Sequence, residues 1–358
     1  MPSLKEIKGR INSISSTLAI TSAMKMVAAA KLQKAQMAIQ NMLPYERRLY
    51  SMLVDLMGAM NISAAASEDG SVRGSGSAER GFDQSGDRLS LSNRHDLAGM
   101  DGAYSLMAQR EVRKVAIVAF ASNSSLCGAF NSNVIREATA VINEYRASGL
   151  RDSDIVVYSV GRKMAEAMRK LGFPSPADFT KMSDSPSYEA ASALAQELLD
   201  GFVSGRFDKV ELVYNHYKST SSQPTIRQTY LPLSLADATA DLQAGKIADS
   251  ASESDTNRGA EPVGAPVVRQ GSPTTEDLIV EPSKEALIAT LLPKVIRLRI
   301  FTTLLDSAAA EHAARTVAMQ LATDNGNDLL QELTLEYNKG RQQKITSEIL
   351  DLVGGSMQ

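Results

Sequence analysis

A heptad stripe of apolar side chains runs through the first 42 residues of the chain. Its positions recur at alternating spacings of three and four residues, and ten of the twelve are apolar. They are Leu4, Ile7, Ile11, Ile14, Leu18, Thr21, Lys25, Ala28, Leu32, Ala35, Ile39 and Met42. Such a stripe is typical of a helix that packs along its whole length against another helix in a coiled coil.

The stripe resumes beyond Pro44, at Leu49, Leu53, Leu56 and Met60. Proline lacks the backbone N–H of an intrahelical hydrogen bond, so we expect Pro44 to kink or divide the helix. Sixty helical residues at about 1.5 Å each would reach about 90 Å. That is longer than any compact domain this chain could form, so the sequence predicts an extended coiled-coil helix over residues 1–60.

A second long helix is predicted near the C-terminus, within residues 276–358. It begins near Ser283, and Pro293 is expected to limit or kink its first turns. Gly326 and Gly340 lie inside it, and each weakens a helix by about 1 kcal/mol relative to alanine. A helix that tolerates both glycines needs a partner. We therefore expect it to pair with the N-terminal helix as an antiparallel coiled coil.

Residues 111–235 alternate strand and helix patterns. This order is typical of an α/β body with a mostly parallel sheet and right-handed crossovers, its last two strands pairing as a hairpin. The expected strands are 112–120, 154–160, 177–181, 209–217 and 225–231, and the expected helices are 133–147, 162–171 and 188–203. Residues 61–110 and 236–275, rich in Gly, Ser or Asp, are expected to be flexible insertions.

The charge and the rare residue types exclude several classes of protein. With 38 Lys and Arg against 41 Asp and Glu, the net charge of −3 argues against a dedicated nucleic-acid binder. One cysteine excludes an intrachain disulfide, and three histidines far apart in sequence do not suggest a metal site. The chain has no apolar run of about 18 residues and no recognisable targeting segment at its start. We expect a bacterial protein on the cytosolic side.

A nucleotide site is disfavoured, although the α/β pattern invites one. The loop after the first strand, residues 121–131, is not a glycine-rich phosphate loop, and Gly161 stands alone after the second strand. Cys127 is better interpreted as a small buried residue than as a nucleophile. His312 is expected on the helix surface or between helices, and His216 is expected to face solvent or a partner. The residues alone therefore indicate an architectural or mechanical protein without cofactor or metal.

Two features of the helices leave alternatives open. Residues 1–48 carry eight basic and two acidic side chains, which fits either a solvated face or a contact surface for an acidic partner. The end of the C-terminal helix is apolar, and it needs either a partner or the chain's own body to cover it. The apolar side chains of this end are Ile345, Ile349, Leu350, Leu352 and Val353.

Several segments together are specific enough to indicate a family. The run ITSAMKMVAAAKL at 20–32 and, in the last helix, EHAAR at 311–315, ATDNG at 322–326 and LTLEYN at 333–338 are the most distinctive. The last helix continues with Arg341-Gln342, Ile345-Thr346, Glu348 and Gly354-Gly355. Shorter matches are Leu126-Cys127-Gly128 with Phe130-Asn131, and Glu281-Pro282-Ser283. Across both helices and the body, the chain resembles the γ subunit of bacterial F-type ATP synthase, the central stalk of F1.

This resemblance implies a fold and a role. The expected fold is a long antiparallel coiled coil of the terminal helices with a central Rossmann-like α/β domain that binds no nucleotide. The two helices would form an asymmetric shaft inside a ring of three α and three β subunits. The body would sit with the ε subunit on the membrane c-ring, at the cytoplasmic face of the inner membrane. Such a subunit is non-catalytic and transmits torque to the β subunits for ATP synthesis.

The resemblance also implies contact residues. Met24, Lys25 and Met26 would lie where the shaft meets the lower part of the β subunits. Arg341 and Gln342 would meet a catch loop of β, with Thr346 and Glu348 above them. The apolar end would approach a bearing formed by the ring, through Ile349, Leu350, Leu352 and Val353.

The chain departs from the family pattern at several places. The stretch Asn123-Ser124-Ser125 stands where the family usually has an Asp-Arg pair. Leu18-Ala19 and Ser22 replace residues that usually include basic ones, and Thr316 stands where Met is common. These differences reduce the basic contact surface of the first helix.

Two other classes of protein share some of these features. A coiled-coil scaffold or tether with an α/β adaptor domain accounts for the heptads and predicts homodimers. An α/β enzyme with helical dimerisation arms needs a ligand site, and it predicts turnover by the isolated chain. The rotor interpretation predicts a stoichiometric complex with ATP-hydrolysing subunits at the membrane.

Overall fold

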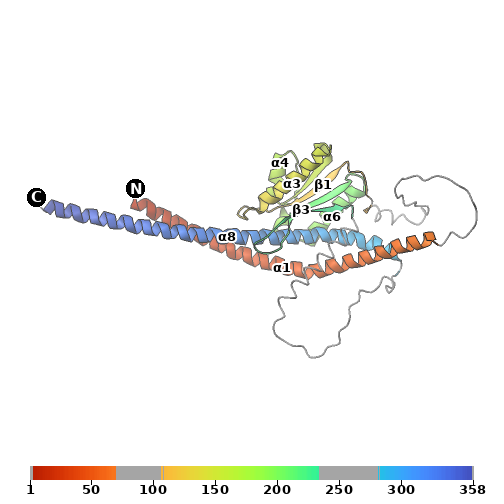
Figure 1. The fold of residues 1–358 in the computed structure, drawn as a ribbon, viewed down its shortest axis with the longest axis horizontal. Helices are drawn as coiled ribbons and strands as arrows, with labels where there is room; N and C mark the ends of the chain where they lie inside the picture. The colour runs from red at the N-terminus through yellow and green to blue at the C-terminus, as the bar shows by residue number, and fades with distance from the viewer. Residues whose placement is uncertain (1–2, 70–105, 108, 234–280, 282, 357–358) are drawn as a thin grey trace, which may run out of the picture.

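The computed structural model describes residues 3–69, 106–107, 109–233, 281 and 283–356. Two long helices, α1 (Leu4–Asp69) and α8 (Lys284–Ser356), lie side by side and run in opposite directions. A sheet with its own helices packs on one side of this pair, as Figure 1 shows. The pairing of the two ends of the chain, predicted from the heptad stripe, is therefore present.

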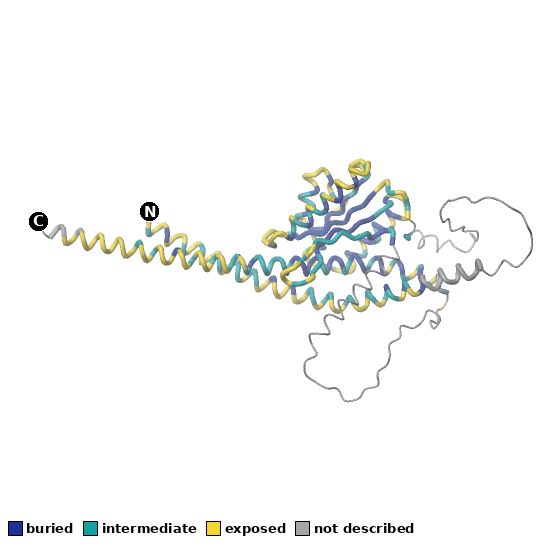
Figure 2. Tube along the Cα trace, viewed as in Figure 1, coloured by how far each residue is buried: buried dark blue, intermediate teal, exposed yellow. Residues whose placement is uncertain are grey.

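The heptad positions of α1 form its inner face. All twelve positions from Leu4 to Met42 are buried or half-buried. Ile7, Ala28 and Leu32 are the most deeply buried of them. Figure 2 shows the same arrangement along the paired helices, where exposed and less exposed residues alternate. Burial of one stripe against a partner supplies most of the stability that such long helices need.

Pro44 does not divide the first helix. α1 continues through Pro44 and ends at Asp69, and Figure 1 shows it bent along its length. Residues 61–69 were expected in a flexible insertion, and the structure corrects this. Residues 61–69 contain three alanines and no glycine or proline, so nothing in them disfavours a helix. The next glycine in the sequence is Gly70. The rest of that expected insertion, and residues 236–275, lie largely or wholly outside the described residues.

The second helix begins at a capped end. The Ser283 hydroxyl accepts a hydrogen bond from the Ala286 N–H at 3.1 Å, which satisfies one of the free donors of the first turn. Pro293 lies within α8 and does not end it. At the other end, Leu4, the first residue of α1, lies against Gly340. Beyond Gly340 α8 therefore extends past the start of α1, as Figure 1 shows.

The sheet is mixed, with the strand order β2-β1-β3-β4. Its strands are β1 (Val115–Phe120), β2 (Ile155–Val160), β3 (Lys209–Asn215) and β4 (Thr225–Leu231). β1 pairs in parallel with β2 and β3, while β3 pairs antiparallel with β4. The predicted hairpin pairing of the last two strands is confirmed.

One expected strand, 177–181, is absent. The chain instead enters the short helix α5 (Thr180–Asp184). The Asp178 carboxylate accepts a hydrogen bond from the Thr180 N–H at 2.9 Å, which favours a turn into a helix over an extended strand. The other helices of the body are α3 (Phe130–Ala147), α4 (Arg162–Lys170) and α6 (Tyr188–Val203), with a 3₁₀ turn at Asp152–Asp154.

Both faces of the sheet are covered, and β1 is buried throughout. Its alternate residues Val115, Ile117 and Ala119 pack with residues of α3 and α4. Ala116, Val118 and Phe120 point the other way, into a core shared with α6 and both long helices. The long helices contribute Tyr50, Leu53 and Leu56 from α1 and Ile288, Leu292, Val295, Ile296, Ile300 and Leu304 from α8. This apolar core thus fixes the body to the pair of long helices, α1 and α8, which we call the rod.

Candidate functional site

The rod between the body and its tip is held by close packing and by polar contacts between the two helices. Ala309 and Ala313 of α8 are fully buried and pack with Leu32 of α1. Further along, the Thr323 hydroxyl lies 3.1 Å from the Thr21 hydroxyl. Small side chains on α8 let the two backbones approach, which fixes their register along the rod.

The three residues expected to contact a ring around the rod have different environments. Lys25 is half-buried, and its Nζ donates to the Gln320 Oε1 of α8 at 2.8 Å. Met24 is also half-buried. Met26 is 63% exposed, and Ile20, Val27 and Met37 of the same helix are exposed as well. Met26 is therefore the member of the trio whose side chain is exposed on α1.

The end of α8 is a single exposed helix. Every residue from 341 to 350 is exposed, including Arg341, Gln342, Thr346 and Glu348. Leu350 and Leu352 are 65% and 74% exposed, and Ile349 and Val353 are exposed as well. Figures 1 and 2 show this end projecting away from the body. The alternative that the apolar tip folds back on the chain's own body is therefore wrong.

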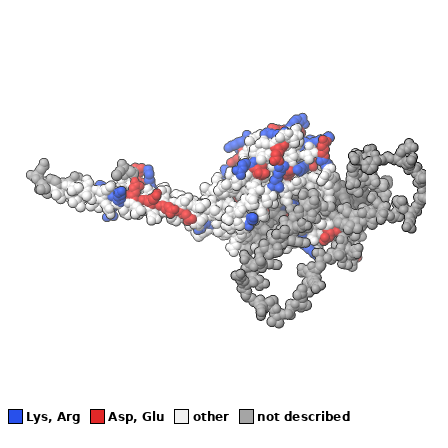
Figure 3. Space-filling model, viewed as in Figure 1, with Lys and Arg blue, Asp and Glu red and all other residues white. Residues whose placement is uncertain are grey.

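An acidic stripe lies on the rod, between the body and the tip. Asp324, Asp328, Glu332 and Glu336 are all exposed and follow one another at four-residue spacing. Side chains four residues apart are neighbours on a helix surface, and Figure 3 shows a line of acidic groups on this part of the rod. This stripe was not predicted from the sequence, although the four-residue spacing of its carboxylates is a signal that could have revealed it.

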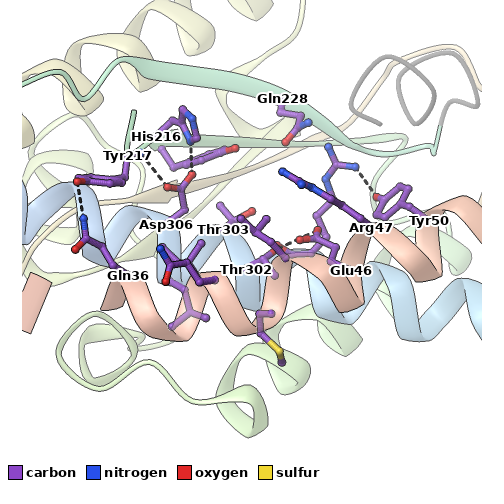
Figure 4. A pocket seen from close by; sticks show the side chains of 17 residues that line it. Gln36, Glu46, Arg47, Tyr50, His216, Tyr217, Gln228, Thr302, Thr303 and Asp306 are labelled. Atoms are coloured by element: carbon purple, nitrogen blue, oxygen red, sulfur yellow. Dashed lines mark hydrogen bonds and ion pairs between the residues drawn. The ribbon is translucent and has the colours of Figure 1, made fainter. Parts of the chain in front are cut away.

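A cavity of about 440 Å³ lies where the body meets the rod. Residues of α1, β3, β4, α8 and the connection after β3 line it, and Figure 4 shows two polar groups at its ends. At one end Gln36, His216, Tyr217 and Asp306 lie together. At the other are Glu46, Arg47 and Tyr50, with a hydrogen bond of 3.1 Å from the Thr302 hydroxyl to the Glu46 carboxylate.

His216, expected to face solvent or a partner, is half-buried and contacts α8 of its own chain. Its Nδ1 lies 2.6 Å from the Asp306 Oδ2, across the junction between the body and α8. The hydrogen bond to Asp306 raises the pKa of His216, against a smaller opposing effect of burial. Asp306 also accepts a hydrogen bond from the Tyr217 N–H at 2.9 Å. No sequence signal joins His216 and Asp306, which lie ninety residues apart.

His312, expected on the helix surface or between helices, is half-buried on α8. Burial lowers its pKa to about 4, and the nearby positive charges of Arg315 and Lys31 act in the same direction. Among the described residues there is no group of three or more His, Cys, Asp or Glu side chains that could hold a metal ion. His312 is therefore neutral near pH 7 and belongs to the packing of α8.

The turns after β1 and β2 are filled by the chain itself. A β-carbon on Gly161 would lie 2.0 Å from the Ala121 carbonyl oxygen, so this glycine permits close packing of two backbone segments. Cys127 is buried and packs with Phe130 and Ala310, as a structural cysteine would. In the part of the chain that the structure describes, no helix combines the length and apolarity that crossing a membrane requires.

Comparison with known proteins agrees with this architecture. A family model described as ATP synthase matches residues 3–357. The chain is 46% identical to the ATP synthase gamma chain of Phocaeicola vulgatus, with 100% of both chains covered. It is 45% identical to that of Bacteroides thetaiotaomicron over the same share, and 36% identical to that of Flavobacterium johnsoniae over 99% of this chain and 98% of that one.

Solved structures have the same fold. A chain in the OSCP/F1/c-ring structure of the Euglena gracilis mitochondrial ATP synthase is similar, with a TM-score of 0.54 and 19% identity. The match covers 99% of this chain and 93% of that chain. Because a family model matches almost the whole chain and bacterial relatives are up to 46% identical over their full length, the chain belongs to the ATP synthase gamma chain family.

Proposed function

We propose that this chain is the non-catalytic rotor subunit of an F1Fo ATP synthase. In this role α1 and α8 act as an antiparallel coiled coil inside an α3β3 ring, and the Rossmann-like body joins the ε subunit and the c-ring. The complex would lie at the cytoplasmic face of the bacterial inner membrane. The observation that carries the proposal is the bare end of α8, which extends past α1 with exposed polar and apolar side chains.

The rod can perform such work without chemistry of its own. An asymmetric rigid element that favours different conformations of a ring at different angles provides a coupling free energy between distant sites. Rigidity comes from the shared core that joins the sheet to both long helices, through residues such as Leu53 and Ile296. Asymmetry comes from α8 extending alone beyond Gly340.

The contacts with the ring are also proposals. We place Met26, with Met24 and Lys25 beside it, against the lower part of the β subunits. Arg341 and Gln342 would meet a catch loop of β, because an exposed guanidinium can bind a carboxylate through two hydrogen bonds. Thr346 and Glu348 would lie above them. Ile349, Leu350, Leu352 and Val353 would form the bearing end, where an apolar surface needs cover.

Arg341→Ala tests this role. Arg341 is exposed on a part of α8 that no other described element covers, so the variant should fold and assemble normally. In membrane vesicles we expect a several-fold lower ratio of ATP-driven proton pumping to ATP hydrolysis. Arg136→Ala, on an exposed position of the body, is the matched control and should leave the ratio unchanged.

Three outcomes would contradict the proposal. An unchanged ratio of proton pumping to ATP hydrolysis in Arg341→Ala would contradict the proposed contact of Arg341 with the catch loop. Purification of the chain from membranes as a homodimer, without α and β subunits, would instead favour the tether, and turnover by the isolated chain would favour an enzyme.

A further inference from the structure

Tyr217 is the residue at which the body, α1 and α8 meet. It is the second residue after β3, and its hydroxyl accepts a hydrogen bond from the Gln36 side chain of α1 at 2.6 Å. Its ring packs against two small apolar clusters, one with Leu32, Ala309 and Ala313 and the other with Cys127, Phe130 and Ala310. A shift of this side chain would therefore loosen the body from both long helices at once.

Asp306 of α8 holds this residue in place from the opposite side. One carboxylate oxygen accepts the Tyr217 N–H at 2.9 Å, and the other lies 2.6 Å from the His216 Nδ1. The Asp306 side chain is 17% exposed, while that of His216 is 44% exposed. His216 can therefore exchange its proton with solvent while it remains hydrogen-bonded to a mostly buried carboxylate.

The charged groups around His216 are of both signs. Asp306 faces it from α8, and Lys218 follows it in the same connection. Glu46 and Arg47 of α1 line the same cavity toward its other end (Figure 4). Arg299 of α8 also lines it and donates a hydrogen bond to the Tyr50 hydroxyl. Asp306 is the group in hydrogen-bond contact with the imidazole, and Lys218 opposes protonation from a greater distance.

We propose that Asp306 is a positioning residue that fixes the body to both long helices, and that protonation of His216 strengthens its hold. We call Gln36, His216, Tyr217 and Asp306 the junction latch. With His216 protonated, Asp306 is held by a charge-assisted hydrogen bond and keeps its other oxygen on the Tyr217 amide. Charge-assisted bonds are about twice as strong as neutral ones, so the latch is tighter in the protonated state.

The direction in which the strength of the latch changes with pH follows from the His216–Asp306 hydrogen bond. The hydrogen bond to Asp306 raises the pKa of His216 above its ordinary value of about 6.5. The latch is therefore complete below that ordinary value and weakens as the pH rises through the raised one. The apolar core between the body and the rod does not titrate, so the loss is local and does not detach the body.

Hydrogen exchange of the Tyr217 amide measures the latch directly. The assembled complex is studied from about pH 6 to about pH 9, with correction for the intrinsic pH dependence of amide exchange. We expect protection at Tyr217 to fall about fivefold across this range, because His216, which holds the Asp306 carboxylate in place, loses its charge. Protection that does not change with pH would overturn the proposal.

Three variants and one control variant separate this role from a merely structural one. Asp306→Asn retains an oxygen that can accept the Tyr217 N–H but removes the charge, and His216→Gln retains a neutral donor. Both should give low protection that is constant with pH. Lys218→Gln removes the opposing charge and should shift the transition to higher pH, whereas Ser221→Ala in the same connection should behave as the wild type. A pH-dependent transition that persists in Asp306→Asn would contradict the proposed pair.

The consequence for coupling rests on the proposed function. If the body and rod turn together, the ratio of proton pumping to ATP hydrolysis should fall with rising pH in the wild type and stay flat in Asp306→Asn. The two ideas fail separately. The pH dependence of exchange at Tyr217 tests the junction latch independently of the rotor role. The Arg341→Ala experiment tests the rotor role independently of the latch.

Discussion

Leu18 of α1 lies directly against Gly326 of α8. A β-carbon built on this glycine would come to 2.6 Å from the Leu18 Cδ2 and to 3.2 Å from its Cγ. Glycine weakens a helix interior by about 1 kcal/mol relative to alanine, yet here it makes room for a heptad side chain of the partner helix. Gly326, which has a low helix propensity, is thus part of the contact between the helices.

A double-mutant cycle tests this relationship. Gly326→Ala alone should lower the free energy of unfolding of the full-length chain by about 1 kcal/mol, because overpacking outweighs the gain in helix propensity. In a Leu18→Ala background the same change should raise it by about 1 kcal/mol. Denaturant unfolding of the four proteins measures both values. Additive effects of the two single changes would show that the residues do not contact each other in solution.

Gly340→Ala is the matched comparison for this cycle. Its β-carbon would lie 3.2 Å from the Leu4 Cδ2, at the exposed start of α1, where the leucine can move aside. We expect this variant to be neutral or more stable by up to about 1 kcal/mol. The difference in sign between the two glycines would then follow from what lies opposite each one.

The pairing of the two ends was predictable because a heptad stripe is a local, repeated signal. All twelve positions from Leu4 to Met42 lie on the inner face of α1. The strand expected at 177–181 was wrong, because the Asp178 carboxylate accepts hydrogen bonds from Thr180 and favours a turn into α5. The junction latch was beyond prediction from the residues, because His216 and Asp306 carry no pattern that links them. The roles of Arg341 and Gln342 came from the family resemblance alone.

Truncation after Gly340 separates the stability of the chain from its assembly. Residues 341–350 are exposed throughout, so their removal should shift the midpoint of thermal unfolding by no more than about 2 °C. The shortened chain should nonetheless recover far less β subunit on purification from membranes. The combined variant Ile349→Ser, Leu350→Ser, Leu352→Ser and Val353→Ser preserves the helix length and tests the apolar tip alone. A large loss of thermal stability in either variant would mean that the tip packs on the chain itself.

Glu211 is a buried carboxylate at the centre of an ion-pair network in the sheet. It accepts hydrogen bonds from Arg227 at 2.7 Å, Lys209 at 2.6 Å and Tyr145 at 2.6 Å. Glu211→Gln removes the buried carboxylate that Lys209 and Arg227 share, although Arg227 keeps Glu144, and it should lower the free energy of unfolding by about 2 to 3 kcal/mol. Glu144→Gln, at an exposed partner of Arg227, should change it by less than about 1 kcal/mol.

The Glu211 network also predicts a pH dependence. Burial alone would raise the pKa of Glu211, but the hydrogen bonds from Arg227, Lys209 and Tyr145 hold it below its ordinary value. A depressed carboxyl pKa gives stability that is present above the unfolded-state value and is lost as the pH falls through the folded one. Unfolding curves should therefore show a loss of stability below about pH 4.3, and Glu211→Gln should reduce it. Equal slopes in both proteins would contradict this assignment.

His312 predicts a loss of stability at milder acidity. Its pKa of about 4 lies below the ordinary histidine value, because burial and the positive charges of Arg315 and Lys31 disfavour the imidazolium. The unfolded chain therefore binds a proton at higher pH than the folded chain, and stability falls as the pH decreases from about 6.5 toward 4. His312→Gln removes the titrating group, so its free energy of unfolding should change less across this window. His216→Gln is the control, since the raised pKa of His216 acts in the opposite direction and at higher pH. Parallel pH curves for wild type and His312→Gln would show that the imidazole is not held neutral by its surroundings.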